Sequence, residues 1–237
     1  MVAVVAELNP ICIGVDIGQI HDPTAIAVAE VSQLHDGRWK HIQPRRAYFD
    51  AMGQFVPQHD ADPVTVSEYT IRHIERVPLN TSYPDVAKRL ADMLCKPVFY
   101  RRKVRVLIDV TGVGRPVYDD LRKEASLRHE SREAWIKPIS FTHGEKYNRG
   151  TGALAKAFLV SRLQSLLQSN RVHAPETKEV KIMLDELRVY EIKVSQDGSD
   201  TYGAFKVGTH DDLATALGLA CLEDPFSDRV SYSNRVY

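Results

Sequence analysis

The sequence of 237 residues predicts an α/β fold: a mixed central β-sheet, an antiparallel hairpin plus parallel strands, flanked by helices on both faces. Two observations support this class. Two β-branched apolar runs near the start are separated by a short polar segment, which is typical of a hairpin. Later apolar runs alternate with amphipathic helical patterns, which is typical of parallel strands. We expect one domain over residues 11–222, an N-terminal extension over 1–10 and a polar C-terminal tail over 223–237.

Composition indicates an ordinary globular chain, with 43% hydrophobic and 26% charged residues. The formal net charge is zero, so no global field draws nucleic acid to the protein, although local basic patches are compatible with this value. Cys12, Cys95 and Cys221 lack the spacing of a zinc site, which predicts reduced thiols and a cytoplasmic location. No apolar run approaches the roughly 20 residues that span a bilayer.

The opening hairpin carries the first candidate functional residue. Ile11 to Gly18 and Thr24 to Val31 are its predicted strands, and Asp16 lies within the first. A carboxylate in an apolar strand loses hydration, which is costly unless a cation or a hydrogen-bond donor compensates it. A turn cap or an arginine partner is an equally open explanation at this point.

The next hundred residues alternate between strands and irregular segments. We expect a turn at Leu34–Gly37, a strand over Trp39–Phe49, an irregular segment over 50–65 and a strand over Val66–Val77. Apolar spacing predicts a helix over Tyr83–Leu94, with Pro84 in its first turn.

A second carboxylate, Asp109, ends the strand predicted over Lys103–Val110. The glycines after it favour a tight turn into a helix through Leu127, because neither GxxxxGK[ST] nor GxGxxG occurs in the chain. Further along we expect these elements: a strand over Trp135–Phe141, a polar loop over Thr142–Gly152, helices over Ala153–Gln168 and Val180–Tyr190, and a hairpin over Glu191–Lys206 turning at Asp197-Gly198.

The last predicted helix, Thr209–Leu222, opens with Asp211 and Asp212. Taken alone, the pair is explained by helix capping, with Thr209 and Asp212 spaced as in a capping box. Taken with Asp16 and Asp109, it suggests a different role, because ligands gather where the carboxyl ends of strands meet helix starts. Carboxylates brought together there need divalent cations, and all-oxygen ligands suit Mg²⁺ or Mn²⁺. Two such ions support phosphodiester hydrolysis.

Five segments stand out in order along the chain: GVDIGQIHDPTAIAV, VLIDVTGVGRPVYDDL, KAFLVSRLQSLLQSNRV, MLDELRVYEIKVSQDGSDTYGAF and THDDLATALGLA. Together they resemble the nuclease domain of large terminase subunits of tailed bacteriophages. The resemblance implies an RNase H-like fold and a two-metal DNA endonuclease that cuts concatemeric duplex DNA during packaging in the host cytoplasm. It places the metal-binding, catalytic acids at Asp16, Asp109 and one or both of Asp211 and Asp212. It implies a packaging ATPase domain, a small terminase subunit and a portal as partners.

The sequence leaves several alternatives open. A complete large terminase also carries an ATPase with Walker motifs, which this sequence lacks, so an excised domain and a stand-alone protein are both possible. A resolvase-like nuclease for branched DNA shares the expected fold. A non-catalytic packaging module predicts missing acids, and a sugar-kinase-like nucleotide binder predicts a second phosphate hairpin; the sequence supports neither expectation.

Basic residues suggest where DNA binds. His143, Lys146 and Arg149 lie in the loop after a strand and are the first candidates; Arg45 and Arg46 are a second pair. The run from Arg101 to Arg105 precedes the Asp109 strand, away from the acids, and we expect it to be a solvated face.

Overall fold

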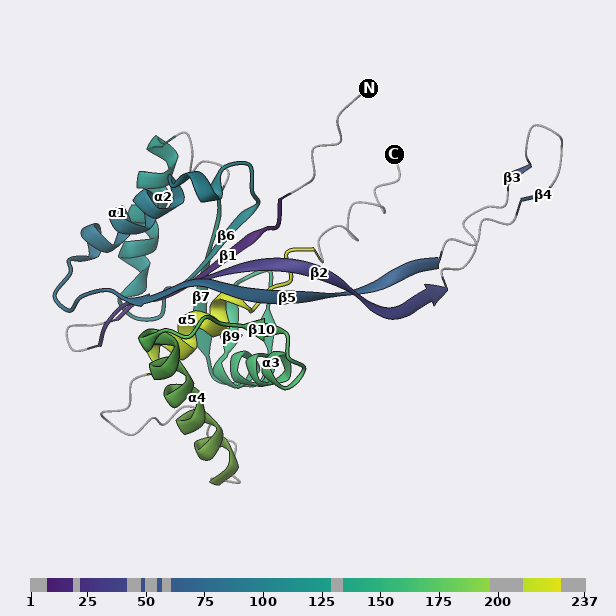
Figure 1. Ribbon diagram of the computed structural model, residues 1–237. Helices are drawn as coiled ribbons and strands as arrows, with labels where there is room; N and C mark the ends of the chain where they lie inside the picture. Colours follow the sequence, from purple (N-terminus) through teal and green to yellow (C-terminus); the bar gives the residue numbers. More distant parts are fainter. Residues whose placement is uncertain are drawn as a thin grey trace.

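The computed structural model describes residues 8–18, 22–41, 48–49, 55–56, 61–128, 134–196 and 211–226. In these residues, eight strands form one mixed sheet with the order β10-β5-β2-β1-β6-β7-β9-β8, and β3 pairs separately with β4. Helices cover both faces of the large sheet (Figure 1). The predicted fold class is therefore confirmed.

The centre of the sheet is formed by β1 (Ile11–Asp16), which pairs antiparallel with β2 (Ala25–His41) and parallel with β6 (Val104–Asp109). β6 pairs in parallel with β7 (Trp135–Thr142). The remaining strands are β5 (Ala61–Arg76), β8 (Tyr147–Asn148), β9 (Ala153–Ala155) and β10 (Val172–His173). Because β1, β6 and β7 are parallel, their carboxyl ends lie at one edge of the sheet.

β2 and β5 continue beyond the other strands as a two-stranded ribbon (Figure 1). The expected turn at Leu34–Gly37 and separate strand at Trp39 are wrong, because β2 runs unbroken to His41. Its pairing with β5 shifts register between His35 and Trp39, where Gly37 has a φ of 83°. A bulge therefore replaces the turn. The segment expected to be irregular, 50–65, contains β4 (Phe55–Val56), which pairs with β3 (Tyr48–Phe49) just before it, and the first residues of β5.

Two helices cover one face of the sheet and three cover the other (Figure 1). α1 (Tyr83–Leu94) has the predicted bounds, and Ser82 caps it by accepting the N–H of Asp85. It shares its face with α2 (Gly114–Leu127), and a short 3₁₀ turn, Pro97–Phe99, follows α1. The opposite face carries α3 (Lys156–Gln168), α4 (Lys178–Gln196) and α5 (Asp212–Ala220). No helix in the described ranges is long and apolar enough to span a membrane.

The boundaries expected around α3 and α4 are wrong. Ala153–Ala155 pairs with β7 as a strand, so the helix begins at Lys156. α4 continues to Gln196, so Glu191–Gln196 is helical where a strand was expected; Asp197 and Gly198 lie outside the described residues.

Alternation along β1 decides which residues face α5. Ile13 and Val15 pack with α1 and α2, whereas Cys12 packs with α5 on the other face. Gly14 shares that second face, and a Cβ on it would lie 1.9 Å from the carbonyl oxygen of Ala216. α5 therefore rests directly on β1, and only glycine permits this approach. Asp16, two residues further, faces the same side.

Candidate functional site

Asp16 and Asp109 end two adjacent parallel strands. Val15 of β1 lies opposite Ile108 of β6, so the next residue on each strand brings the two aspartates side by side. They share a face of the sheet as well, because Leu107, two residues before Asp109, packs against Leu219 of α5. The predicted meeting of these two acids at the carboxyl edge follows from strand register and alternation.

The turn after β6 fixes the Asp109 carboxylate. Asp109 is 9% exposed, and its Oδ1 accepts the N–H of Thr111 at 2.7 Å. The Thr111 hydroxyl oxygen accepts the N–H of Phe141 at 2.8 Å, which ties the turn to β7. A Cβ on Gly114 would lie 1.9 Å from the carbonyl oxygen of Asp109. The glycine thus has the tight-turn role expected from the sequence.

Asp211 completes this group from α5. It occupies the N-cap position, yet its side chain makes no capping hydrogen bond, so the capping explanation is wrong for this residue. Its Oδ2 instead lies 2.6 Å from Nζ of Lys156. The α5 start is stabilised from α4, where Glu186 Oε2 accepts the N–H of Ala214 at 2.9 Å. A neighbouring helix therefore supplies the cap.

Asp212 is held in a different place. Its two oxygens accept hydrogen bonds from Arg76, at 2.7 Å from Nε and 3.0 Å from Nη2. Arg76 also donates to Glu186. Asp212 is only 5% exposed, and burial raises the pKa of Glu186 to about 7. The paired acids at the helix start, which the sequence could not distinguish, thus contact different cations.

Electrostatics connect Asp16, Asp109 and Asp211, which we call the acidic cluster. Loss of hydration raises the pKa of Asp16 well above its usual value, and Asp109 and Asp211 raise it further, more than Asp212 does. Burial also raises the pKa of Asp109, and this effect is larger than the lowering by the hydrogen bonds from Thr111. Lys156 lowers both pKa values but does not outweigh the other effects. Among the described residues, three carboxyl groups therefore share one neighbouring ammonium group.

The cluster's chemistry suits a divalent cation, although the side chains are not arranged as its ligands. In the described ranges, no three His, Cys, Asp or Glu side chains are grouped to hold a metal ion, and Lys156 holds Asp211. The donors are all carboxylate oxygens that repel one another, which is the set that Mg²⁺ or Mn²⁺ binds. Asp16, Asp109 and Asp211 are the residues that would hold such ions.

The sequence did not point to Lys156, Arg76 or Glu186 as members of the site. One feature of Lys156 could have indicated a partner outside its helix: it is the first residue of a helix, where the macrodipole disfavours a cation. Arg76 and Glu186 carried no such signal, because their partners lie 136 and 28 residues away.

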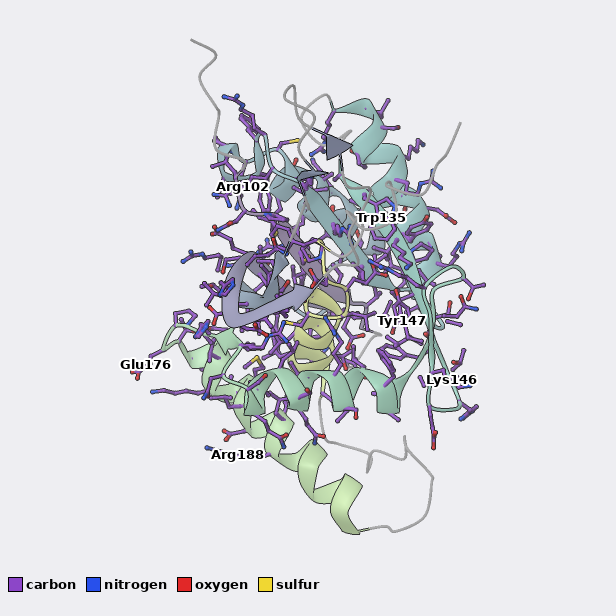
Figure 2. The ribbon with its side chains drawn as sticks, turned by 90° about the vertical axis from the view of Figure 1, so that its right-hand side faces the viewer. Arg102, Trp135, Lys146, Tyr147, Glu176 and Arg188 are labelled. Carbon is purple, nitrogen blue, oxygen red and sulfur yellow. The ribbon has the colours of Figure 1, made fainter. Side chains whose placement is uncertain are left out.

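The loop predicted to touch DNA follows β7 at the same edge of the sheet as the acidic cluster. His143, Lys146 and Arg149 are all exposed. Figure 2 shows Lys146 on the outer side of the hairpin that β8 and β9 form. Arg45 and Arg46 lie outside the described residues.

A second charged group lies at the other end of α5. Glu223 is 4% exposed and accepts hydrogen bonds from Lys137 Nζ at 2.6 Å and from the Tyr147 hydroxyl. Arg105 and Arg149 each lie 3.5 Å from it. We call these five residues the Glu223 network. Arg105 is therefore not part of a solvated face, and Glu223 packs into the fold although it begins the segment expected to be a tail.

Comparison with solved structures finds terminase nuclease domains of similar fold. The large terminase nuclease from thermophilic phage G20c has a TM-score of 0.48 and 19% identity, covering 90% of this chain and 81% of that one. The human cytomegalovirus terminase nuclease domain, Mn soaked and inhibitor bound, has a TM-score of 0.48 and 12% identity, covering 93% and 86%. The chain is similar to these nuclease domains. No protein-family model and no curated protein matches it.

Proposed function

We propose that this chain is a divalent-metal-dependent endonuclease that hydrolyses phosphodiesters of duplex DNA. The observation that carries the proposal is the convergence of Asp16, Asp109 and Asp211 from two strand ends and one helix start on one face of the sheet. The resemblance of the sequence motifs to large terminase nucleases gives the biological setting: cutting of concatemeric DNA during packaging, alongside an ATPase domain, a small terminase subunit and a portal.

The roles of the residues follow from their contacts. Two Mg²⁺ or Mn²⁺ ions, when bound, would activate a water and stabilise the leaving oxygen of the phosphodiester. Asp16 and Asp109 would hold them from rigid strand ends, and the Thr111 N–H fixes the Asp109 carboxylate. Asp211 would close the site from α5. Asp212 positions the α5 start through Arg76.

DNA would lie across the carboxyl edge of the sheet. His143 and Lys146 follow β7 at that edge and would contact phosphates. Arg149, further along the loop and 3.5 Å from Glu223, remains a candidate for the same role, as do Arg45 and Arg46. These contacts position the backbone without reading sequence.

The direct test is nicking and linearisation of supercoiled plasmid with Mn²⁺ and with Mg²⁺. Linear duplex and branched DNA should be tested in parallel. We expect cleavage of plasmid that EDTA and Asp109→Asn both abolish. Asp119→Asn is the matched control, because Asp119 is an exposed aspartate on α2. Cleavage of branched DNA alone would favour a resolvase-like enzyme. If the wild-type protein leaves all three substrates intact, the proposal is wrong.

A further inference from the structure

Among the described residues, Lys156 is the cation that the fold brings to the acidic cluster. It is the first residue of α3, and its Nζ lies 2.6 Å from Asp211 Oδ2 and 5.8 Å from the centre of the Phe141 ring. α3 packs against α5 where Leu159 meets Gly218; a Cβ on this glycine would lie 2.8 Å from Leu159 Cγ. Gly218 lies in the last turn of α5, and the ion pair between Lys156 and Asp211 joins the starts of the two helices.

The position of Lys156 is unfavourable for its own helix. A cation at a helix N-terminus opposes the macrodipole. α3 has no acidic residue in its first turn, and the preceding Ala155 provides no side-chain cap. The ammonium group forms an ion pair with Asp211 at the start of α5.

Lys156 partly neutralises the acidic cluster. Asp16, Asp109 and Asp211 carry up to three negative charges, and Lys156 supplies one positive charge. Lys156 lowers the pKa of both Asp16 and Asp109, so its field reaches the whole cluster. The Lys156 and Asp211 side chains are 26% and 21% exposed, so water reaches the ion pair and its partners can exchange.

We propose that Lys156 is an internal counter-ion that competes with divalent cations for the Asp211 carboxylate. A cation entering the cluster must displace the ammonium group from Asp211, so Lys156 lowers the affinity of the site for metal. In the absence of metal, Lys156 stabilises the fold by partly neutralising the cluster. This inference rests on the proposed function, because it takes the acidic cluster to be the metal site.

The test measures Mn²⁺ binding by electron paramagnetic resonance for the wild type, Lys156→Met and Lys156→Arg. We expect Lys156→Met to bind Mn²⁺ about five- to tenfold more tightly, since a partly exposed ion pair is removed. Lys156→Arg keeps the charge and should stay within about twofold of the wild type. Lys123→Met, which removes an exposed lysine from α2 on the other face of the sheet, should bind like the wild type.

Thermal unfolding in EDTA provides the second readout. Lys156→Met should unfold at a lower temperature than the wild type. Adding Mn²⁺ should raise the unfolding temperature of Lys156→Met by more than it raises that of the wild type. In an Asp211→Asn background, the effect of Lys156→Met on Mn²⁺ affinity should largely disappear, because the shared partner is gone.

The outcomes separate this inference from the proposed function. If the wild type binds Mn²⁺ and cleaves DNA, but Lys156→Met binds Mn²⁺ equally or more weakly, Lys156 is not a competitor and the nuclease proposal stands. If the wild type neither binds Mn²⁺ nor cleaves DNA, both proposals fall.

Discussion

The two ends of α5 carry charged groups with opposite balance. At its start, the acidic cluster has three carboxylates and one ammonium group, with Lys156 on Asp211. Beyond its end, the Glu223 network has one carboxylate, contacted by Lys137, Arg105 and Arg149. Both groups lie on the same face of the sheet. Asp109 is four residues beyond Arg105 on β6, or about 13 Å along the strand.

The pKa values at the two ends move in opposite directions. Burial and neighbouring carboxylates raise the pKa of Asp16. Burial would also raise the pKa of Glu223, but hydrogen bonds from Lys137 and Tyr147 outweigh it and lower the pKa below its usual value. Among the described residues, one buried acid thus has several cationic partners, whereas the set of three has one, Lys156. Such a deficit distinguishes a candidate ligand-binding site from a structural ion-pair network.

Neutralising one acid of the acidic cluster should have the largest effect. Asp16→Asn should reduce metal-dependent plasmid cleavage at least about 10³-fold, because a ligand for the ions is lost. In EDTA it should raise the free energy of unfolding by about 1 kcal/mol, because a poorly hydrated charge among like charges is removed. Urea unfolding and nicking rates measure both. An unchanged nicking rate, or a loss of stability in EDTA, would contradict this assignment.

The same neutral substitution in the Glu223 network should have the opposite effect on stability. Glu223→Gln leaves Lys137 buried without its charge partner, so we expect a loss of about 3 kcal/mol in the free energy of unfolding. Urea unfolding at about pH 7 measures it. Glu176→Gln is the control, because Glu176 is exposed at the surface (Figure 2). A loss no larger than that of the control would show that the network contributes little.

The loss of stability caused by Glu223→Gln should depend on pH. The pKa of Glu223 is lower in the folded protein than its usual value of 4.5, so its contribution is complete above that value. The contribution is lost as the pH falls through the folded pKa. The stability difference between wild type and Glu223→Gln should therefore shrink as the pH falls below about 4.5. A difference that grows over this range would overturn the interpretation.

Asp211 and Asp212 offer a sharper comparison within one turn of α5. Asp211→Asn should reduce cleavage at least about tenfold more than Asp212→Asn, because only Asp211 belongs to the acidic cluster. Asp212→Asn should cost about 2 kcal/mol of stability, because Arg76 loses a buried charged partner. Single-turnover nicking and urea unfolding separate the two effects. A larger cleavage loss in Asp212→Asn would assign the metal site to Asp212.

What the sequence could and could not predict follows from the range of the interactions. The bounds of α1, the placing of Asp16 on the first strand and that of Asp109 near the end of a later strand depend on local periodicity, which a single sequence contains; that β1 ends at Asp16 itself was not predicted. The contacts of Lys156 with Asp211 and of Arg76 with Asp212 join residues 55 and 136 positions apart, which no period encodes. The turn expected at Leu34–Gly37 failed because a distant strand, β5, supplies partners that keep β2 extended. Glu191–Gln196 has strand-like residues, but α4 continues through them.

The smallest expected effect concerns the loop beside the acidic cluster. Lys146 is exposed at the outer side of the β8–β9 hairpin, and each phosphate that a lysine neutralises adds about 0.9 to the salt-dependence slope of DNA affinity. Lys146→Ala should therefore lower duplex affinity about threefold at low salt and reduce that slope by about 0.9. Cleavage at saturating DNA should change little, since the acidic cluster is intact. Fluorescence anisotropy over a salt series measures the slope, with Lys123→Ala on the opposite face as control. A slope equal to that of the control would remove Lys146 from the DNA interface and limit the candidates in this loop to His143 and Arg149.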